Sequence, residues 1–229
     1  MVLYVISVGG SLIVPGVIDV EFLKNFKAFI SKRIETGDRF ILISGGGRTA
    51  RNYQLAAQAV LEIDAEERDW LGIHSTRLNG HLLRTIFKEQ ANPQIITNYI
   101  DDLDTVKFSE SVLVGAGWKP GWSTDYDAVL MAEKYGATTV INLSNIMQVC
   151  AEDPRENPLA EKFSNMAWAD FQKLVGDKWD PGMSAPFDPI ASKKAKDLGL
   201  QVAIMNGSDL ANVEAFMNGE DYIGTLIKD

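Results

Sequence analysis

The stretch RFILISGGGRTARNY, residues 39–53, joins an apolar run to three consecutive glycines and then to a segment of helical character. The apolar residues Phe40–Ile43 predict a buried strand. A tight strand-to-helix turn needs one glycine or two, and glycine loses more conformational freedom on ordering than any other residue. Gly45, Gly46 and Gly47 together therefore suggest that something lies against bare backbone at this turn.

Short apolar runs alternate with longer amphipathic ones along the rest of the chain, without a linker or an internal repeat. This order favours an α/β fold over an all-β fold. The predicted strands are Leu3–Val8, Phe40–Ser44, Ser111–Val114, Thr139–Asn142 and Gln201–Met205. The predicted helices are Val20–Thr36, Arg48–Ile63, Trp70–Glu89, Tyr126–Tyr135, Trp168–Val175, Asp188–Leu198 and Leu210–Asn218, with Gly136 and Gly199 closing two of them. The economical arrangement is a largely parallel central sheet between two helical layers, a three-layer α/β/α sandwich.

Composition limits the kinds of partner. The 229 residues include 22 basic and 31 acidic ones, and the net charge of -9 argues against a surface that coats nucleic acid. Cys150 is the only cysteine, so we expect a reducing cytoplasm. The opening MVLYVISVGG lacks the features of a signal peptide, and no apolar run reaches the ~18 residues of a membrane helix. His74 and His81 lie two turns apart on a predicted helix without a carboxylate between them, and we predict no protein metal site.

The segments that follow the strands carry the functional signal, because ligands of such sheets bind beyond the carboxyl ends of the strands. These segments are Gly9–Ser11, Gly45–Arg48, Gly115–Asp125 and Leu143–Pro154, and three of the four are rich in glycine or hydroxyl groups. Neither GGS nor GGGR matches the P-loop or the dinucleotide fingerprint. Glycines at helix N-termini suit anions, so the pattern suggests two phosphate-like groups side by side. The alternative is that the glycines serve only tight turns.

Several charged and polar side chains lie next to these segments. Arg48 and Arg51 follow the three glycines and suit phosphate oxygens, although solvated arginines are the alternative for at least one of them. Lys193, on the predicted helix after APFDP, suits the charge that develops in phosphoryl transfer. Asp69 is predicted either to cap its helix or to accept a hydrogen bond from a ligand.

The segment GWSTD offers a second set of polar and aromatic groups. Ser123 and Thr124 stand immediately before a predicted helix, where their hydroxyl groups can cap the helix or bind a ligand. Trp118 and Trp122 flank the glycines of this segment, which is typical of a ligand-binding face.

The order of motifs identifies a family. The sequence resembles the amino acid kinase superfamily, and most closely the archaeal-type UMP kinases. The resemblance covers nearly the whole chain through SVGGSLIVPG, SGGGRTARNY, DWLGIHSTRLNGHLL, PGWSTDYDAVLMAE, NLSNI, EDP, FDPIASKKAKDLG and GTLI. It implies an amino acid kinase-like fold in one domain, 1–229, with an acceptor-binding lobe of about 1–135 and an ATP-binding lobe of about 136–229. It also implies transfer of the γ-phosphoryl group of ATP to UMP, giving UDP, with Mg²⁺ and in a homohexamer.

The resemblance also implies roles for individual residues. Lys193 and Arg51 would act in catalysis. The ATP side would consist of Gly10, Ser11, Gly47, Arg51, Ser144, Asn145, Cys150 and Asp153. The acceptor side would consist of Gly46 at the UMP phosphate, Asp69 at the ribose, and Gly117, Trp118, Gly121, Trp122, Ser123, Thr124 and Asp125 around the acceptor.

Two motifs depart from the family pattern. The family's TNVDGVY is SNIMQVC here, so that Met147 and Cys150 replace an aspartate and an aromatic residue at the nucleotide. The family's GGTxPGHTTD is GAGWKPGWSTD here, which places Trp118 and Trp122 at the acceptor. These departures leave two alternatives: a kinase of this fold for another small phosphate or carboxylate acceptor, and a non-catalytic nucleotide- or anion-binding homologue.

Overall fold

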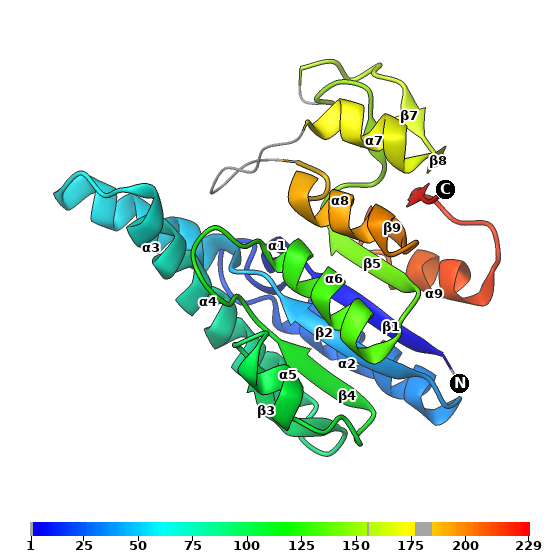
Figure 1. Ribbon diagram of the computed structural model, residues 1–229, viewed down its shortest axis with the longest axis horizontal. Coiled ribbons are helices and arrows are strands. Elements are labelled where there is room, and N and C mark those ends of the chain that lie inside the picture. Colours follow the sequence, from blue (N-terminus) through cyan, green and yellow to red (C-terminus); the bar gives the residue numbers. More distant parts are fainter. Residues whose placement is uncertain (1, 155, 177–184) are drawn as a thin grey trace.

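An eight-stranded sheet forms the centre of the computed structural model, which describes residues 2–154, 156–176 and 185–229 (Figure 1). The strands follow the order β3 (Ala91–Ile96), β4 (Val112–Gly115), β2 (Arg39–Ser44), β1 (Leu3–Val8), β5 (Thr139–Ser144), β9 (Gln201–Asn206), β10 (Thr225–Ile227) and β8 (Asn165–Met166). All neighbours pair in parallel except β9 and β10. A separate antiparallel pair joins β6 (Val149–Cys150) to β7 (Lys162–Phe163).

Helices cover both faces of this sheet. One apolar cluster joins the sheet to α1 (Gly10–Ile13), α2 (Val20–Glu35), α4 (Ala65–Ile86) and α9 (Leu210–Asn218). The other cluster joins it to α5 (Asp101–Thr105), α6 (Thr124–Tyr135), α7 (Trp168–Val175) and α8 (Pro189–Asp197). Successive residues of a strand point to opposite faces, so Ile6 packs in the first cluster and Val5 in the second. The predicted three-layer α/β/α sandwich with a largely parallel sheet is confirmed.

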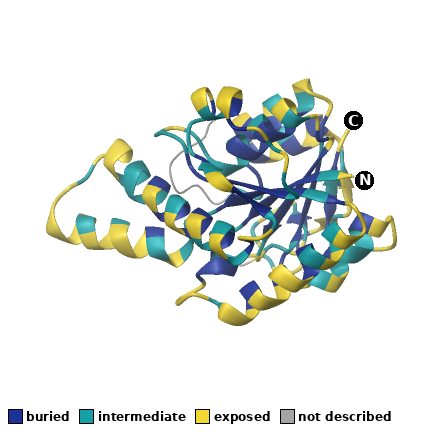
Figure 2. Cartoon of the chain, turned by 90° about the horizontal axis from the view of Figure 1, so that it is seen from below, coloured by how far each residue is buried: buried dark blue, intermediate teal, exposed yellow. Residues whose placement is uncertain are grey.

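The helix α3 (Gly47–Val60) and the first part of α4 project from the body of the protein (Figures 1 and 2). Ala50 is the only residue of α3 that is buried. Tyr53, Leu55 and Val60 of the same helix are exposed, Val60 to 82%. Helix α3 therefore presents apolar side chains that the rest of the described chain does not cover.

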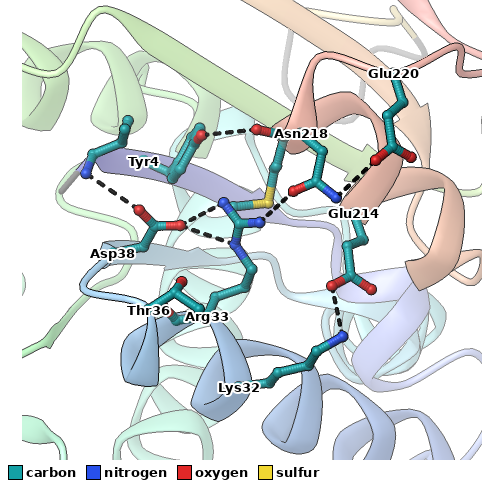
Figure 3. A network of polar contacts seen from close by, with 10 residues as sticks. Tyr4, Lys32, Arg33, Thr36, Asp38, Glu214, Asn218 and Glu220 are labelled. Atoms are coloured by element: carbon teal, nitrogen blue, oxygen red, sulfur yellow. Dashed lines mark hydrogen bonds and ion pairs between the residues drawn. The ribbon is translucent and has the colours of Figure 1, made fainter.

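A polar network lies at the opposite end of β1 and β2 from their carboxyl ends (Figure 3). The Arg33 guanidinium binds the Asp38 carboxylate through Nε at 2.9 Å and through Nη2 at 2.5 Å. The other carboxylate oxygen of Asp38 accepts from the backbone N–H of Val2, and Arg33 also donates to Asn218 of α9 at 2.7 Å. Both charged side chains of this ion pair are largely buried. The network links α2, the start of β1 and α9, and it lies away from the ends of the strands where ligands are expected.

Several predicted boundaries differ from the structure. The strand β3 was not predicted, because Pro93 and the polar residues around it do not resemble a buried strand; β3 lies at the edge of the sheet, where proline is tolerated. The helix α4 begins at Ala65 rather than at Trp70, since Asp64 is its N-cap and accepts from Glu67 N–H. The short elements α1, α5, β6, β7, β8 and β10 were also not predicted. Within the described ranges, no helix is long and apolar enough for a membrane span.

Candidate active site

The two glycine turns after β1 and β2 contact each other through their backbones. A Cβ on Gly10 would lie 2.0 Å from the nitrogen of Gly47 and 2.7 Å from the carbonyl carbon of Gly45. Gly47 also has a φ of +64°, which disfavours any side chain. The close approach of the two turns is therefore one reason why glycine is needed at Gly10, Gly45 and Gly47. A Cβ on Gly46 would point toward Ala50 and α4.

The contact between the loops brings two helix N-termini to one edge of the sheet. Helix α1 begins at Gly10 and α3 begins at Gly47, immediately beyond the carboxyl ends of β1 and β2. The backbone N–H of Gly9 donates to the Leu143 carbonyl at 2.7 Å, which adds the carboxyl end of β5. A Cβ on Gly9 would come within 3.3 Å of the Ser144 Cα. The partial positive charge of helix N-termini makes this edge suited to anions.

Helix α4 holds the glycine turn after β2 and the segment 117–124. This segment is here called the acceptor loop, because the family resemblance predicts that it surrounds the acceptor. The Asn79 side chain donates to the Gly45 carbonyl at 2.7 Å. The Thr76 hydroxyl accepts from Gly117 N–H at 2.8 Å, and Arg77 donates to the Gly117 and Trp118 carbonyls at 3.0 and 2.7 Å. Sequence reasoning missed these roles, because polar residues inside an amphipathic helix resemble a solvated face.

Asp69 lies within α4 and not at its N-cap, so the capping interpretation is wrong. Its carboxylate accepts from Gly121 N–H in the acceptor loop at 2.8 Å. Burial raises the pKa of Asp69, and the hydrogen bond from Gly121 opposes this effect. Asp69 therefore fixes the acceptor loop relative to α4.

The aromatic residues of the acceptor loop pack as a series of ring contacts. Trp118 and Trp122 meet edge to face at 4.8 Å between centroids, and Trp122 meets Tyr126 at 4.5 Å. Trp118 also contacts Tyr99 at 6.0 Å and packs against the core. The Lys119 ammonium lies 4.1 Å from the Trp118 ring centroid and 4.7 Å from that of Trp122, within cation–π range. Lys119 was not predicted as a site residue.

The start of α6 connects the acceptor loop to α8. The Ser123 hydroxyl caps α6 by accepting from Tyr126 N–H at 3.1 Å, so the capping interpretation holds for Ser123, while Thr124 is the first helical residue. Asp125 accepts from the backbone N–H of Asp188 at 3.1 Å and from the Ser7 hydroxyl at 3.4 Å. Burial, helped by the charge of Asp188, raises the pKa of Asp125 to about 7.

Asp188 in turn is the N-cap of α8 and accepts from Ala191 N–H at 2.7 Å. Lys193 follows in this helix and lines a cavity of about 520 Å³ between α7 and α8, together with Lys173 and Lys196. The next residue, Lys194, pairs with Glu133 of α6 at 2.6 Å. Thus α6 holds the helix of Lys193 at both of its ends.

The two arginines after the glycine turn are both exposed. Arg48 donates to the Asn52 side chain at 3.0 Å, which agrees with a solvated role for one of the two. Arg51 lies one turn into α3 at the same edge of the sheet.

The other residues predicted for ATP follow β5. The Ser144 hydroxyl accepts from Ile146 N–H at 3.1 Å, and Asn145 is exposed. Cys150 lies in the separate β6–β7 pair, with its Sγ 3.6 Å from the Gln148 carbonyl. The Asp153 carbonyl accepts from two backbone N–H groups in the following turn. The structure thus brings Ser144 next to Gly9, whereas Cys150 belongs to a different sheet.

Paired glycine turns at the carboxyl edge of a parallel sheet, with polar loops from α4 and α6 around them, define a class of α/β proteins built to bind anionic ligands. The chain belongs to the amino acid kinase family, whose family model matches residues 3–206. It is 34% identical over 226 residues to the uridylate kinase of Methanospirillum hungatei, covering 97% of this chain and 93% of that protein. It is 31% identical to the uridylate kinase of Pyrococcus abyssi, covering 98% of each chain. The crystal structure of the uridylate kinase from Archaeoglobus fulgidus superposes with a TM-score of 0.80 at 26% identity, covering 98% of this chain and 99% of that one.

Proposed function

We propose that this protein is an ATP-dependent nucleoside monophosphate kinase that converts UMP to UDP. The observation that carries the proposal is the pair of glycine turns in backbone contact, which can bring two phosphate groups together at one sheet edge. Full-length similarity to proteins named uridylate kinase supports UMP as the acceptor.

In the reaction, an oxygen of the UMP phosphate attacks the γ-phosphorus of ATP while the bond from that phosphorus to the bridging oxygen of ADP breaks. Catalysis of such a transfer consists mainly of positioning and charge stabilisation. Gly10, Ser11 and Gly47 would hold the donor phosphates, and Gly46, which points toward α4, the UMP phosphate. Lys193 and Arg51 would supply the positive charge that stabilises the transferring group.

The remaining predicted residues fall on the two sides of this edge. On the donor side, Ser144, Asn145, Cys150 and Asp153 would contact ATP. On the acceptor side, Asp69 and the loop 117–124 with Asp125 would surround the nucleoside. We keep the approximate division into an acceptor lobe, 1–135, and an ATP lobe, 136–229. Residues 1–135 contribute β1 to β4, and residues 136–229 contribute β5 to β10.

Mg²⁺ is the cofactor that would accompany ATP. When bound, it would neutralise negative charge on the phosphates. Among the residues in ranges 2–154, 156–176 and 185–229, no three His, Cys, Asp or Glu side chains gather as a metal site. In kinases Mg²⁺ is usually held by one or two carboxylates together with nucleotide phosphates and water.

The aromatic series in the acceptor loop favours a second candidate function. Trp118 and Trp122, with Lys119 over both rings, place large side chains and one positive charge in the acceptor loop. A narrower, cationic pocket would suit another small phosphate or carboxylate acceptor. The transferred group and the donor would be the same in both cases.

We also propose that the protein assembles as an oligomer, with six chains by family resemblance. Helix α3 packs along α4, with Gln54 donating to the Arg68 carbonyl at 2.9 Å, but it buries only one side chain there. We propose that a second copy of the chain covers the apolar side chains that α4 leaves exposed. Leu55→Glu would place a charge on this apolar face, and we expect a smaller particle in light scattering. Lys24→Glu, on the exposed face of α2, is the control. An unchanged mass for Leu55→Glu would contradict this role of α3.

The function is tested by a coupled assay of ADP release with ATP and Mg²⁺. UMP, CMP, dUMP and several carboxylic acids serve as acceptors. Turnover with UMP above the other acceptors supports the proposal, and turnover with a different acceptor supports the second candidate. ATP binding without turnover for any acceptor would mean a non-catalytic nucleotide-binding protein.

A further inference from the structure

Lys119 lies in the acceptor loop with an ammonium group that contacts two indole rings. The side chain is half-buried, and its Nζ lies 4.1 Å from the Trp118 ring centroid and 4.7 Å from the Trp122 ring centroid. Within the described part of the chain, Lys119 forms no ion pair with an acid, so the two ring faces take the place of a carboxylate. The face of an indole attracts a cation more strongly than other aromatic rings do, and partial exclusion of water increases the attraction.

The backbone of the acceptor loop is held by α4. The N–H of Gly117 donates to the Thr76 hydroxyl at 2.8 Å, and the N–H of Gly121 donates to the Asp69 carboxylate at 2.8 Å. These hydrogen bonds hold the main chain of the loop at two points, but they do not orient the ring of Trp122. The orientation of that ring depends on its own side-chain neighbours.

The two indoles differ in how they are held. Trp118 packs against the core and contacts the buried Tyr99, with 6.0 Å between ring centroids. Trp122 belongs to neither core cluster, and its ring meets Trp118 at 4.8 Å and Tyr126 at 4.5 Å. Because Lys119 contacts both indoles, it links the ring of Trp122 to a ring that the core already holds.

We propose that Lys119 is a positioning residue that holds the Trp122 ring and so fixes one wall of the acceptor pocket. The two indole planes meet at 66°, and a Trp122 ring that turned away from Trp118 would lose its contact with the cation. With the ring held, the acceptor does not have to order it on binding, which favours affinity. The position of Trp122 beside the acceptor rests on the proposed function, whereas the hold of Lys119 on the ring does not.

Two substitutions separate the charge of Lys119 from its apolar stem. Lys119→Met keeps an unbranched side chain and removes the ammonium, and Lys119→Arg keeps a cation that can lie over an indole. Lys27→Met is the matched control, because Lys27 is an exposed lysine of α2.

Circular dichroism reports on the rings, because two indoles in close contact give an exciton band. Trp122→Phe lacks the pair with Trp118 and therefore identifies this band in the spectrum of the whole protein. The KM values for UMP and ATP report separately on the two sides of the site.

For Lys119→Met we expect a weaker exciton band and a KM for UMP about fivefold higher than in the wild type, since the ring loses a cation–π attraction. The kcat and the KM for ATP should change by less than about twofold, because the acceptor side alone is altered. Lys119→Arg and Lys27→Met should retain the wild-type band and the wild-type KM for UMP.

An unchanged exciton band in Lys119→Met would overturn the proposal, as would equal increases in both KM values. A loss of the band in Lys119→Arg as large as in Lys119→Met would overturn the role of the charge. A weaker band with an unchanged KM for UMP would place Trp122 outside the acceptor pocket and overturn its role there. If the wild type does not phosphorylate UMP, the band alone decides the role of Lys119, and the failure lies with the proposed function.

Discussion

Replacing Gly10 with alanine tests the contact between the two glycine turns. The new Cβ would lie 2.0 Å from the Gly47 nitrogen and 2.6 Å from its Cα, and no real Cβ tolerates such distances. Both atoms are main-chain atoms of a turn fixed between β2 and α3, so they cannot rotate away as a side chain would. Overpacking costs about 1–3 kcal/mol, and backbone contact puts Gly10→Ala at the upper end, about 3 kcal/mol. For a chain of this size each kcal/mol lowers Tm by about 2–4 °C, so we expect a decrease of about 6–12 °C.

Gly16→Ala is the matched control, because nothing lies within 4 Å of the Cβ that it would add. Glycine-to-alanine changes at tolerant positions stabilise by about 0.4–1 kcal/mol, so this variant should melt at or slightly above the wild-type temperature. Thermal denaturation followed by circular dichroism compares the three proteins, and equilibrium dialysis measures their ATP affinity. If Gly10→Ala melts with Gly16→Ala and binds ATP equally well, the backbone contact does not constrain the loops as described.

Lys193→Ala should lower kcat by at least about a hundredfold with a smaller change in the KM for ATP, because a transition-state cation is lost; unchanged turnover would remove Lys193 from the mechanism. The pKa of Asp125 is about 7 in the folded protein and about 3.9 in the unfolded chain. Between these values the folded state retains a proton that the unfolded state loses. The stability of the wild type should therefore fall as the pH rises from about 4 to about 7. Urea unfolding of Asp125→Asn should show a weaker decrease over this window, and parallel curves would contradict the shift. Asp38→Ala leaves the buried Arg33 unpaired and should cost about 3–5 kcal/mol in urea unfolding, with specific activity of the folded protein unchanged. A cost below about 1 kcal/mol would show that the pair is solvated.

Part of the fold could be predicted because β1, β2, β5 and β9 are buried on both faces and therefore form continuous apolar runs. The edge strand β3 gave no such signal, since Pro93 interrupts its apolar residues. The register of β3 with β4 also shifts between Ala91 and Ile95. The start of α4 was misplaced because Asp64 and Asp69 both suit an N-cap, and only the fold decides between them.

Site prediction had a similar limit. The glycines after the strands could be found from their positions, but the contact of Gly10 with Gly47 joins residues far apart in sequence and depends on the pairing of β1 with β2. Lys119 resembles a solvated loop lysine, which is the usual state of that residue type. Its contact with two indole rings follows from the packing of Trp118 against the core, which the local sequence does not encode.

Transfer of labelled phosphate tests the central claim most directly. The protein is incubated with ATP labelled at the γ-phosphate, Mg²⁺ and UMP, and the nucleotides are separated and identified. The proposed reaction predicts that the label appears in the β-phosphate of UDP, in step with ADP formation and only when UMP is present. Label released as inorganic phosphate, or retained in ATP while UMP is in excess, would contradict UMP kinase activity.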